Sequence, residues 1–137
     1  MKYYNITKFP KWQQRVIKEA SETAENFITK KYNIDNDIFE LVELRISNTC
    51  RFAKYNTGYG KIRLNGKLNF VNLYDKKSIG SYKKIISSIG YKVSYICQLI
   101  HELTHFVQDL EDRCFSEVET TQNEIEYLES IGYKIKL

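Results

Sequence analysis

Residues 93–110 read VSYICQLIHELTHFVQDL and carry apolar side chains at every third or fourth position. That spacing is typical of one face of an α-helix. The apolar positions are Tyr95, Ile96, Leu99, Ile100, Leu103, Phe106, Val107 and Leu110. We therefore predict a long helix from about Val93 to Leu110, with one side buried against the rest of the protein.

Helices are also predicted on both sides of this stretch. Pro10 is typical of a helix start, and apolar residues continue at helical spacing to about Lys31. A short helix is predicted around residues 82–88, ending at Gly90, because glycine often follows the last turn of a helix. The last helix is predicted from near Ser116 to Ser130.

The residues after the first helix predict strands. Apolar residues from Ile38 to Ile46 predict one strand, and Phe52 to Tyr55 predict a second. Residues 62–72 predict one or two short strands around a hairpin turn at Asn65-Gly66. A helix, a small and mostly antiparallel sheet, and then further helices predict an α+β fold, formed as a single domain over residues 1–137.

The composition is that of a folded globular protein. The 137 residues are 42% hydrophobic and 28% charged, which excludes wholesale disorder and a collagen-like fibre. The formal net charge is +4, and the charges are mixed along the sequence without a basic cluster. This pattern argues against a nucleic-acid-binding protein.

The sequence also predicts a cytoplasmic location. No run of about 18 apolar residues is present, so we expect no membrane-spanning helix. Residues 1–5 lack the apolar core of a signal peptide. The three cysteines are an odd and sparse set, which fits a reducing compartment better than a disulfide framework.

The long helix contains the motif His-Glu-x-x-His at residues 101–105. Residues four apart lie on one helix face with Cβ atoms roughly 6 Å apart, so two imidazoles can share one Zn²⁺ ion. Glu102 lies between them in sequence, where its carboxylate can act as a general base on a zinc-activated water. His101 and His105 are the only histidines, so a third protein ligand has to be Asp, Glu or Cys.

The last helix offers several glutamates as that third ligand. On a helical wheel its buried side is defined by Val118, Ile125 and Leu128. Glu117 and Glu124 flank this side, which favours one of them as an inward ligand.

The other candidates have simpler interpretations. Ser116-x-x-Glu119 has the pattern of a capping box, in which Glu119 turns back to the helix start. Cys97, one turn before His101, is interpreted as a small buried residue. Cys114, in the predicted loop between the two helices, stays a minor alternative ligand.

The motif followed by a glutamate on the next helix resembles the gluzincin zinc metallopeptidases. Residues 117–121 are similar to the Glu-x-x-Ala-(Asp/Asn) pattern of many members, with Thr120 at the small-residue position and Thr121 in place of the acid or amide. Another branch spaces its glutamate so that it falls on Glu124. We favour Glu117, because the small-residue context is more informative than a loop length. The resemblance implies a small sheet, an active-site helix and a C-terminal ligand helix, as in zincins.

These patterns predict a hydrolase: a zinc metallopeptidase that cleaves a peptide or protein substrate. His101, His105 and Glu117 are its expected metal ligands, and Glu102 is its expected general base. The alternative is a non-catalytic zinc-containing binding or regulatory module. The residue that donates a hydrogen bond to the oxyanion is not identified, because eleven tyrosines leave too many candidates.

Overall fold

The computed structural model describes residues 1–50, 53–58 and 60–137. Its α-helices are α1 (Lys11–Tyr32), α2 (Tyr91–Leu110) and α3 (Glu117–Ser130), and its short 3-10 helices are η1 (Ile6–Lys8), η2 (Asn36–Leu41) and η3 (Lys76–Ser78). Its strands are β1 (Lys2–Tyr4), β2 (Glu43–Ser47), β3 (Lys54–Asn56), β4 (Lys61–Asn65), β5 (Val71–Asp75) and β6 (Ser81–Ile86). The predicted α+β class is confirmed.

The strands form two separate sheets. The larger sheet has the order β1-β2-β4-β3, in which β1 and β4 are both parallel to β2 and only β3 runs antiparallel. The prediction of a mostly antiparallel sheet is wrong for this sheet. Parallel neighbours need a crossover between them, and α1 provides it between β1 and β2.

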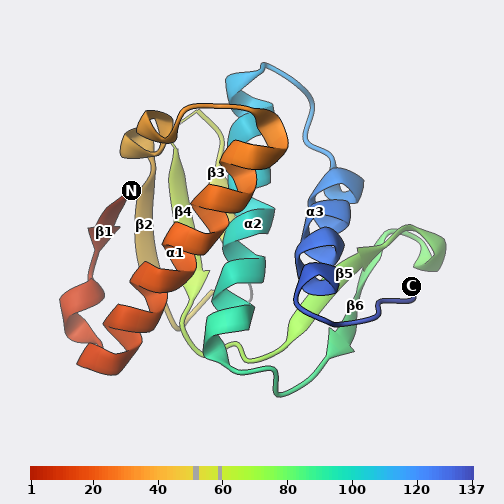
Figure 1. Ribbon diagram of the computed structural model, residues 1–137, viewed down its shortest axis with the longest axis horizontal. Coiled ribbons are helices and arrows are strands. Elements are labelled where there is room, and N and C mark those ends of the chain that lie inside the picture. Colours follow the sequence, from red (N-terminus) through yellow and green to blue (C-terminus); the bar gives the residue numbers. More distant parts are fainter. Residues whose placement is uncertain (51–52, 59) are drawn as a thin grey trace.

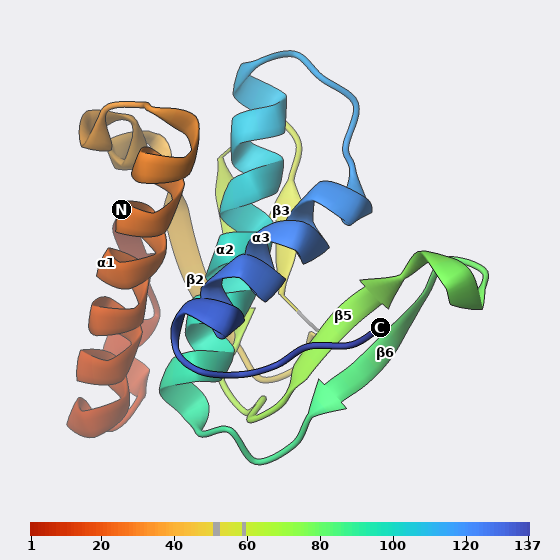
Figure 2. The same ribbon diagram turned by 45° about the vertical axis from the view of Figure 1, so that its right-hand side comes forward.

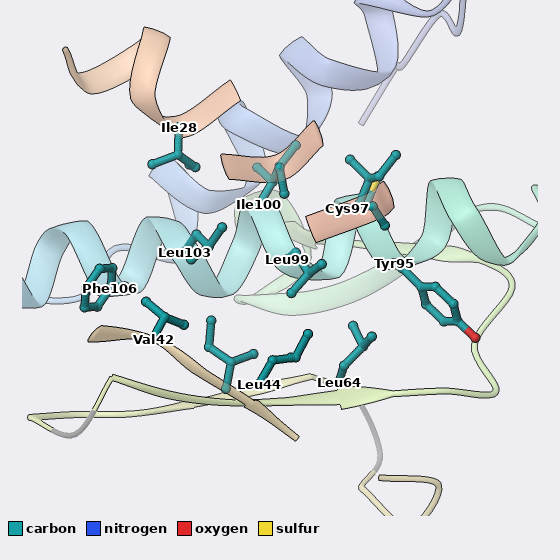
Figure 3. Close-up of a cluster of buried hydrophobic side chains, with 14 of the residues drawn as sticks. Ile28, Val42, Leu44, Leu64, Tyr95, Cys97, Leu99, Ile100, Leu103 and Phe106 are labelled. Carbon is teal, nitrogen blue, oxygen red and sulfur yellow. The ribbon is translucent and has the colours of Figure 1, made fainter. Parts of the chain in front are cut away.

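Two long helices cover one face of the larger sheet (Figure 1). The helix predicted from Pro10 is confirmed as α1, and Asn33 ends it in the left-handed conformation, with φ of 53°. The helix predicted over 93–110 is confirmed as α2. In Figure 3, Leu99, Leu103 and Phe106 of α2 point toward the sheet, where Val42, Leu44 and Leu64 lie. Every one of these side chains is at most 3% exposed, so this layer is the hydrophobic core.

The second sheet is the β5–β6 hairpin, and it corrects the helix predicted around residues 82–88. Residues Ser81–Ile86 are strand β6, which pairs antiparallel with β5. Gly80 enters the strand with φ of 71°, and its missing Cβ would lie 2.8 Å from the Tyr74 hydroxyl. Tyrosine and isoleucine favour strands, and pairing with β5 provides hydrogen bonds for the backbone of β6. A short helix at this position would be marginally stable without packing against the rest of the protein.

Two other strand predictions also need correction. Only Glu43–Ser47 of the apolar run from Ile38 is strand, because Asp35 caps η2 by accepting a hydrogen bond from the Asp37 backbone N–H. Asn65-Gly66 makes no hairpin, since β4 and β5 belong to different sheets. The Gly66 carbonyl instead accepts hydrogen bonds from Gln13 and Tyr95.

The strand predicted from Phe52 to Tyr55 is observed as β3, Lys54–Asn56, while Phe52 itself lies outside the described residues. The last predicted helix is confirmed as α3, which packs on α2 and also contacts the C-terminal end of α1, where Tyr32 bonds to Glu119 and Asn123 (Figure 1). This arrangement places the motif face of α2 between α3 and the hairpin.

Candidate metal centre

Three side chains converge where α2 meets the start of α3. The Nε2 atoms of His101 and His105 lie 3.1 and 2.9 Å from the two carboxylate oxygens of Glu117. One donor atom from each residue falls within 4.8 Å of the others, so this group can hold a metal ion. The helix spacing sets the geometry, because it places the two imidazole rings edge to face with centroids 5.0 Å apart.

The opposite nitrogen of each ring is already engaged. His101 Nδ1 lies 3.1 Å from Glu124 Oε2, and His105 Nδ1 lies 2.9 Å from Gln108 Oε1. A hydrogen bond at Nδ1 fixes the orientation of the ring and directs its Nε2 atom toward the site. Both rings are therefore oriented toward the point occupied by the Glu117 carboxylate.

The electrostatics of the group favour a positive charge. Burial opposes protonation of His101, but the carboxylates of Glu124 and Glu117 raise its pKa well above the ordinary value. Burial acts to raise the pKa of Glu117, yet hydrogen bonds from both histidines and Tyr82 hold it well below its usual range. One carboxylate thus faces two imidazoles, a set of donors that could hold a metal ion.

The candidate glutamates of α3 have separate roles. Glu117 faces the Nε2 atoms and keeps 34% of its side chain exposed, so solvent and a substrate can reach this point. Glu124 is 3% exposed and contacts the far side of the His101 ring, at Nδ1. Both side chains lie inward as the helical wheel predicted, but only Glu117 is placed as a ligand.

Glu119 points away from the histidines. Its carboxylate accepts hydrogen bonds from Arg113, at 2.8 and 3.2 Å, and from the Tyr32 hydroxyl. Ser116 caps α3 by accepting from the Glu119 backbone N–H, as the capping-box pattern predicts. The reciprocal bond is different, because the Ser116 N–H donates to Gln108 instead.

Glu102 is buried beside the two histidines. Its side chain is 6% exposed, and its Oε1 atom lies 3.9 Å from His101 Nε2. Burial is the main cause that raises the pKa of this carboxyl. The Glu102 carboxylate lies beside the donor atoms and is not one of the grouped donors, as expected of a general base that is not a metal ligand.

The mouth of the site has two aromatic walls that the sequence analysis missed. The Tyr82 hydroxyl of β6 donates a hydrogen bond to Glu117, and its ring centroid lies 6.3 Å from that of His101. Phe115, in the loop before α3, stacks on His105 with centroids 4.6 Å apart. Correct assignment of β6 would have drawn attention to Tyr82, whereas no sequence signal identifies Phe115.

Gln108 was also missed, although it carries a readable signal. It follows His105 by three positions, so the two side chains share a helix face. Its amide is held in turn by the Ser116 N–H and carbonyl, at 3.2 and 3.3 Å. Gln108 therefore ties the orientation of His105 to the start of α3.

A small pocket of about 130 Å³ adjoins His101. Leu68, Phe70 and Val71 form its apolar wall, and His101 and Glu102 form the side toward the metal centre. Cys97 also lines it and is 2% exposed, as predicted for a small buried residue, and burial raises the pKa of its thiol. Cys114 is exposed and lies outside the donor group found among the described residues.

Comparisons of the chain with protein-family models, with curated proteins and with solved structures find no match. Among the described residues, no helix has the length and apolar character needed to span a membrane. Functional inference therefore depends on the geometry of the site.

Proposed function

We propose that the chain is a zinc-dependent metallopeptidase of gluzincin type, with His101, His105 and Glu117 as zinc ligands. The observation that carries the proposal is the convergence of two Nε2 atoms and one carboxylate, while both Nδ1 atoms are held from behind. Two imidazoles and one carboxylate are a ligand set of catalytic zinc sites, in which a fourth position stays open.

The charges around the donors support a divalent cation. Glu102, Glu117 and Glu124 bring three carboxyl groups to two imidazoles in a region where four of these five residues are mostly buried. Uncompensated buried charge is costly, so a cation of charge two fits the group. Nitrogen and oxygen donors together favour zinc over calcium or magnesium, which prefer oxygen ligands.

The reaction is assigned to the side chains as follows. Bound zinc supplies Lewis-acid chemistry, which polarises the scissile carbonyl and lowers the pKa of water toward about 7. Glu102 accepts a proton from the attacking water and transfers it to the leaving amine. Burial raises the pKa of the Glu102 carboxyl, which makes it a stronger base than an exposed glutamate. The Tyr82 hydroxyl lies next to the ligands and donates to Glu117; once Glu117 binds the metal, this hydroxyl can change partner and donate its hydrogen bond to the developing oxyanion.

Zinc content is the direct test of the ligand set. We expect one zinc per chain in the wild type and in Glu102→Gln, and loss of zinc in His105→Ala and Glu117→Gln. Glu129→Gln is the matched control, because Glu129 is an exposed glutamate on the same helix. A wild-type protein that cannot be loaded with zinc overturns the proposal.

Turnover separates an enzyme from a zinc-containing binding module. A mixed peptide library digested by the zinc-loaded wild type should give defined cleavage products, and Glu102→Gln should give none. Tyr82→Phe should lower kcat by about a hundredfold, as measured for single oxyanion donors, with little change in KM. Zinc binding without any cleavage would support the module instead.

A further inference from the structure

The β5–β6 hairpin carries a basic surface that becomes apparent only in the fold. Lys76 and Lys77 begin its turn, and Lys83 and Lys84 lie on β6, so two separate pairs in the sequence meet on one arm. All four lysines are exposed. Figure 2 shows this arm extending away from the helices beside α3.

None of these lysines forms an ion pair within 4.0 Å in the described part of the chain, although the hydrogen bond from Ser78 and, at longer range, the charge of Lys83 lower the pKa of the Asp75 carboxyl. Elsewhere Lys31 pairs with Glu126 at 2.7 Å and Lys92 pairs with Glu19 at 3.1 Å, but no such ion pair involves the hairpin lysines. The single acid of the hairpin, Asp75, accepts hydrogen bonds from the Lys77 backbone N–H and the Ser78 hydroxyl within its own turn. The positive charge of the arm is thus available to another molecule.

This basic surface adjoins the candidate metal centre. Alternation along β6 places Lys84 on the same face as Tyr82, the residue that contacts Glu117. The Lys84 Nζ atom lies 4.6 Å from the ring centroid of Phe70, which lines the pocket beside His101. A cation is therefore held at the rim of the pocket.

We propose that this hairpin binds an acidic segment of a polypeptide, which places the adjacent residue in the apolar pocket next to the metal centre. The inference rests on the proposed peptidase function and specifies its substrate class. Charge complementarity supports the acidic segment. The free edge of β6, which pairs only with β5 among the described strands, supports an extended polypeptide that adds main-chain hydrogen bonds.

A nucleic acid fits the same surface less well. Its phosphates repeat regularly along the backbone, so a strand crossing the hairpin brings negative charge to Glu102, Glu117 and Glu124. A polypeptide can place its acids on the lysines and neutral residues over these carboxylates. The favoured occupant is therefore an acidic peptide.

The tip of the hairpin supports the same conclusion independently. Ile79 is 100% exposed and has φ of 62°, in the left-handed region. A β-branched residue is strained in this backbone conformation. Because the side chain is fully exposed, no apolar burial within the chain offsets the strain. An apolar contact with the docked peptide accounts for an isoleucine at this position.

Binding, measured without turnover, tests the inference. The probe is a pair of fluorescent twelve-residue peptides that are identical except that four glutamates in one are glutamines in the other. We expect zinc-loaded Glu102→Gln protein to bind the glutamate peptide about ten- to thirtyfold more tightly at low salt, and the preference to fall as salt screens the lysines.

Two charge-matched variants in the Glu102→Gln background assign this preference to the hairpin. One replaces Lys76, Lys77, Lys83 and Lys84 with glutamine, and the other replaces Lys8, Lys11, Lys18 and Lys30. Only the hairpin variant should lose the preference. Equal losses in both, or no preference in the parent, overturn the inference. A DNA strand of equal charge that competes better than the glutamate peptide also overturns it.

A glycine at the tip gives a second readout. Ile79→Gly should raise the thermal midpoint of the protein and weaken binding of the glutamate peptide severalfold, because the strain and the apolar contact are removed together. A variant that is stabilised but binds unchanged refutes the role of the tip. If the wild type cleaves no peptide but the preference for the glutamate peptide remains, the peptidase proposal is refuted. If the protein cleaves peptides without that preference, only the hairpin inference is refuted.

Discussion

Helices α1 and α3 both pack against α2, but the two contacts are of opposite chemistry. The α1 side is closed by small and aliphatic residues that are fully buried: Ile17, Ala20, Ser21, Ala24 and Ile28. The α3 side buries Thr120, Thr121, Asn123 and Glu124 against a face of α2 that carries the histidines. The α1 contact is mainly apolar, with one buried hydrogen bond from Gln13 to Tyr95. The α3 contact combines hydrogen bonds with the buried side chains of Tyr127 and Leu128.

The difference implies that stability and chemistry are divided between the two contacts. Apolar burial dominates folding free energy, so α1, α2 and the sheet hold the chain together. Buried polar groups cost free energy unless they are hydrogen-bonded, so the polar part of the α2–α3 contact adds little to stability. We infer that its main effect is to fix the positions of the side chains at the site. The predictions below change the bound ion or one helix contact, and measure stability, zinc binding or both.

Zinc itself should have the largest effect. An ion that binds only the folded protein stabilises it by about 4 kcal/mol at a thousand times its Kd. We expect calorimetry to show a rise in thermal midpoint on adding zinc to wild type and none with His105→Ala. An equal rise in both proteins would show that the ion binds elsewhere.

Leu103→Ala tests the apolar side of α2. Leu103 is fully buried against the sheet, so we expect a loss of about 3 kcal/mol in the free energy of unfolding by urea denaturation. Zinc content of the folded variant should stay at one per chain. Leu110→Ala makes the same change at an exposed position on α2 and should cost far less. A loss of zinc in folded Leu103→Ala would contradict the division.

Glu124→Gln tests the polar side. The amide can still accept from His101 Nδ1, but the charge that strengthens this imidazole as a ligand is removed. We expect zinc affinity to fall about ten- to a hundredfold in a chelator competition, as for other residues that support a ligand. Stability of the metal-free protein should also fall, because the buried carboxylate that pairs with His101 is removed. Glu129→Gln should change neither quantity.

Tyr32→Phe should have the smallest effect and appear only at alkaline pH. Burial first, and then the hydrogen bond to Glu119, raises the pKa of Tyr32 to about 12. The contribution of Tyr32 to the free energy of unfolding is therefore complete below about pH 10, the pKa of tyrosine in the unfolded chain. It is lost as the pH rises toward 12. Between these values the stability of Tyr32→Phe should decline less steeply than wild type in urea titrations. Parallel curves would contradict the assignment.

The sequence was most informative where a periodic pattern and burial coincide. The apolar stripe of 93–110 predicted α2, and the same spacing placed His101 and His105 on one face. The helical wheel narrowed the inward glutamates to Glu117 and Glu124. The wheel could not show which of the two is the metal ligand, because that depends on whether the carboxylate reaches Nε2 or Nδ1 of His101.

The elements that depend on distant partners were less predictable. Strand β6 exists because it pairs with β5, and its six residues carry no alternation that indicates a strand. Tyr82 reaches Glu117 across 35 positions of sequence, so no local pattern indicates the contact. The parallel pairing of β1 with β2 likewise depends on the crossover through α1.

The described donors, and the residues that hold the Nδ1 atoms of the two histidines, lie between positions 101 and 124; only Tyr82, which bonds to Glu117, comes from elsewhere in the described part of the chain. His101 and Glu117 are sixteen positions apart, so the chelate closes only a short loop of chain. Closing a short loop costs little entropy, and local contacts form early in refolding. The α2–α3 helical hairpin can thus bind zinc before the sheet is assembled. Zinc should then accelerate refolding, and its affinity for partly folded chains should limit how far it raises equilibrium stability.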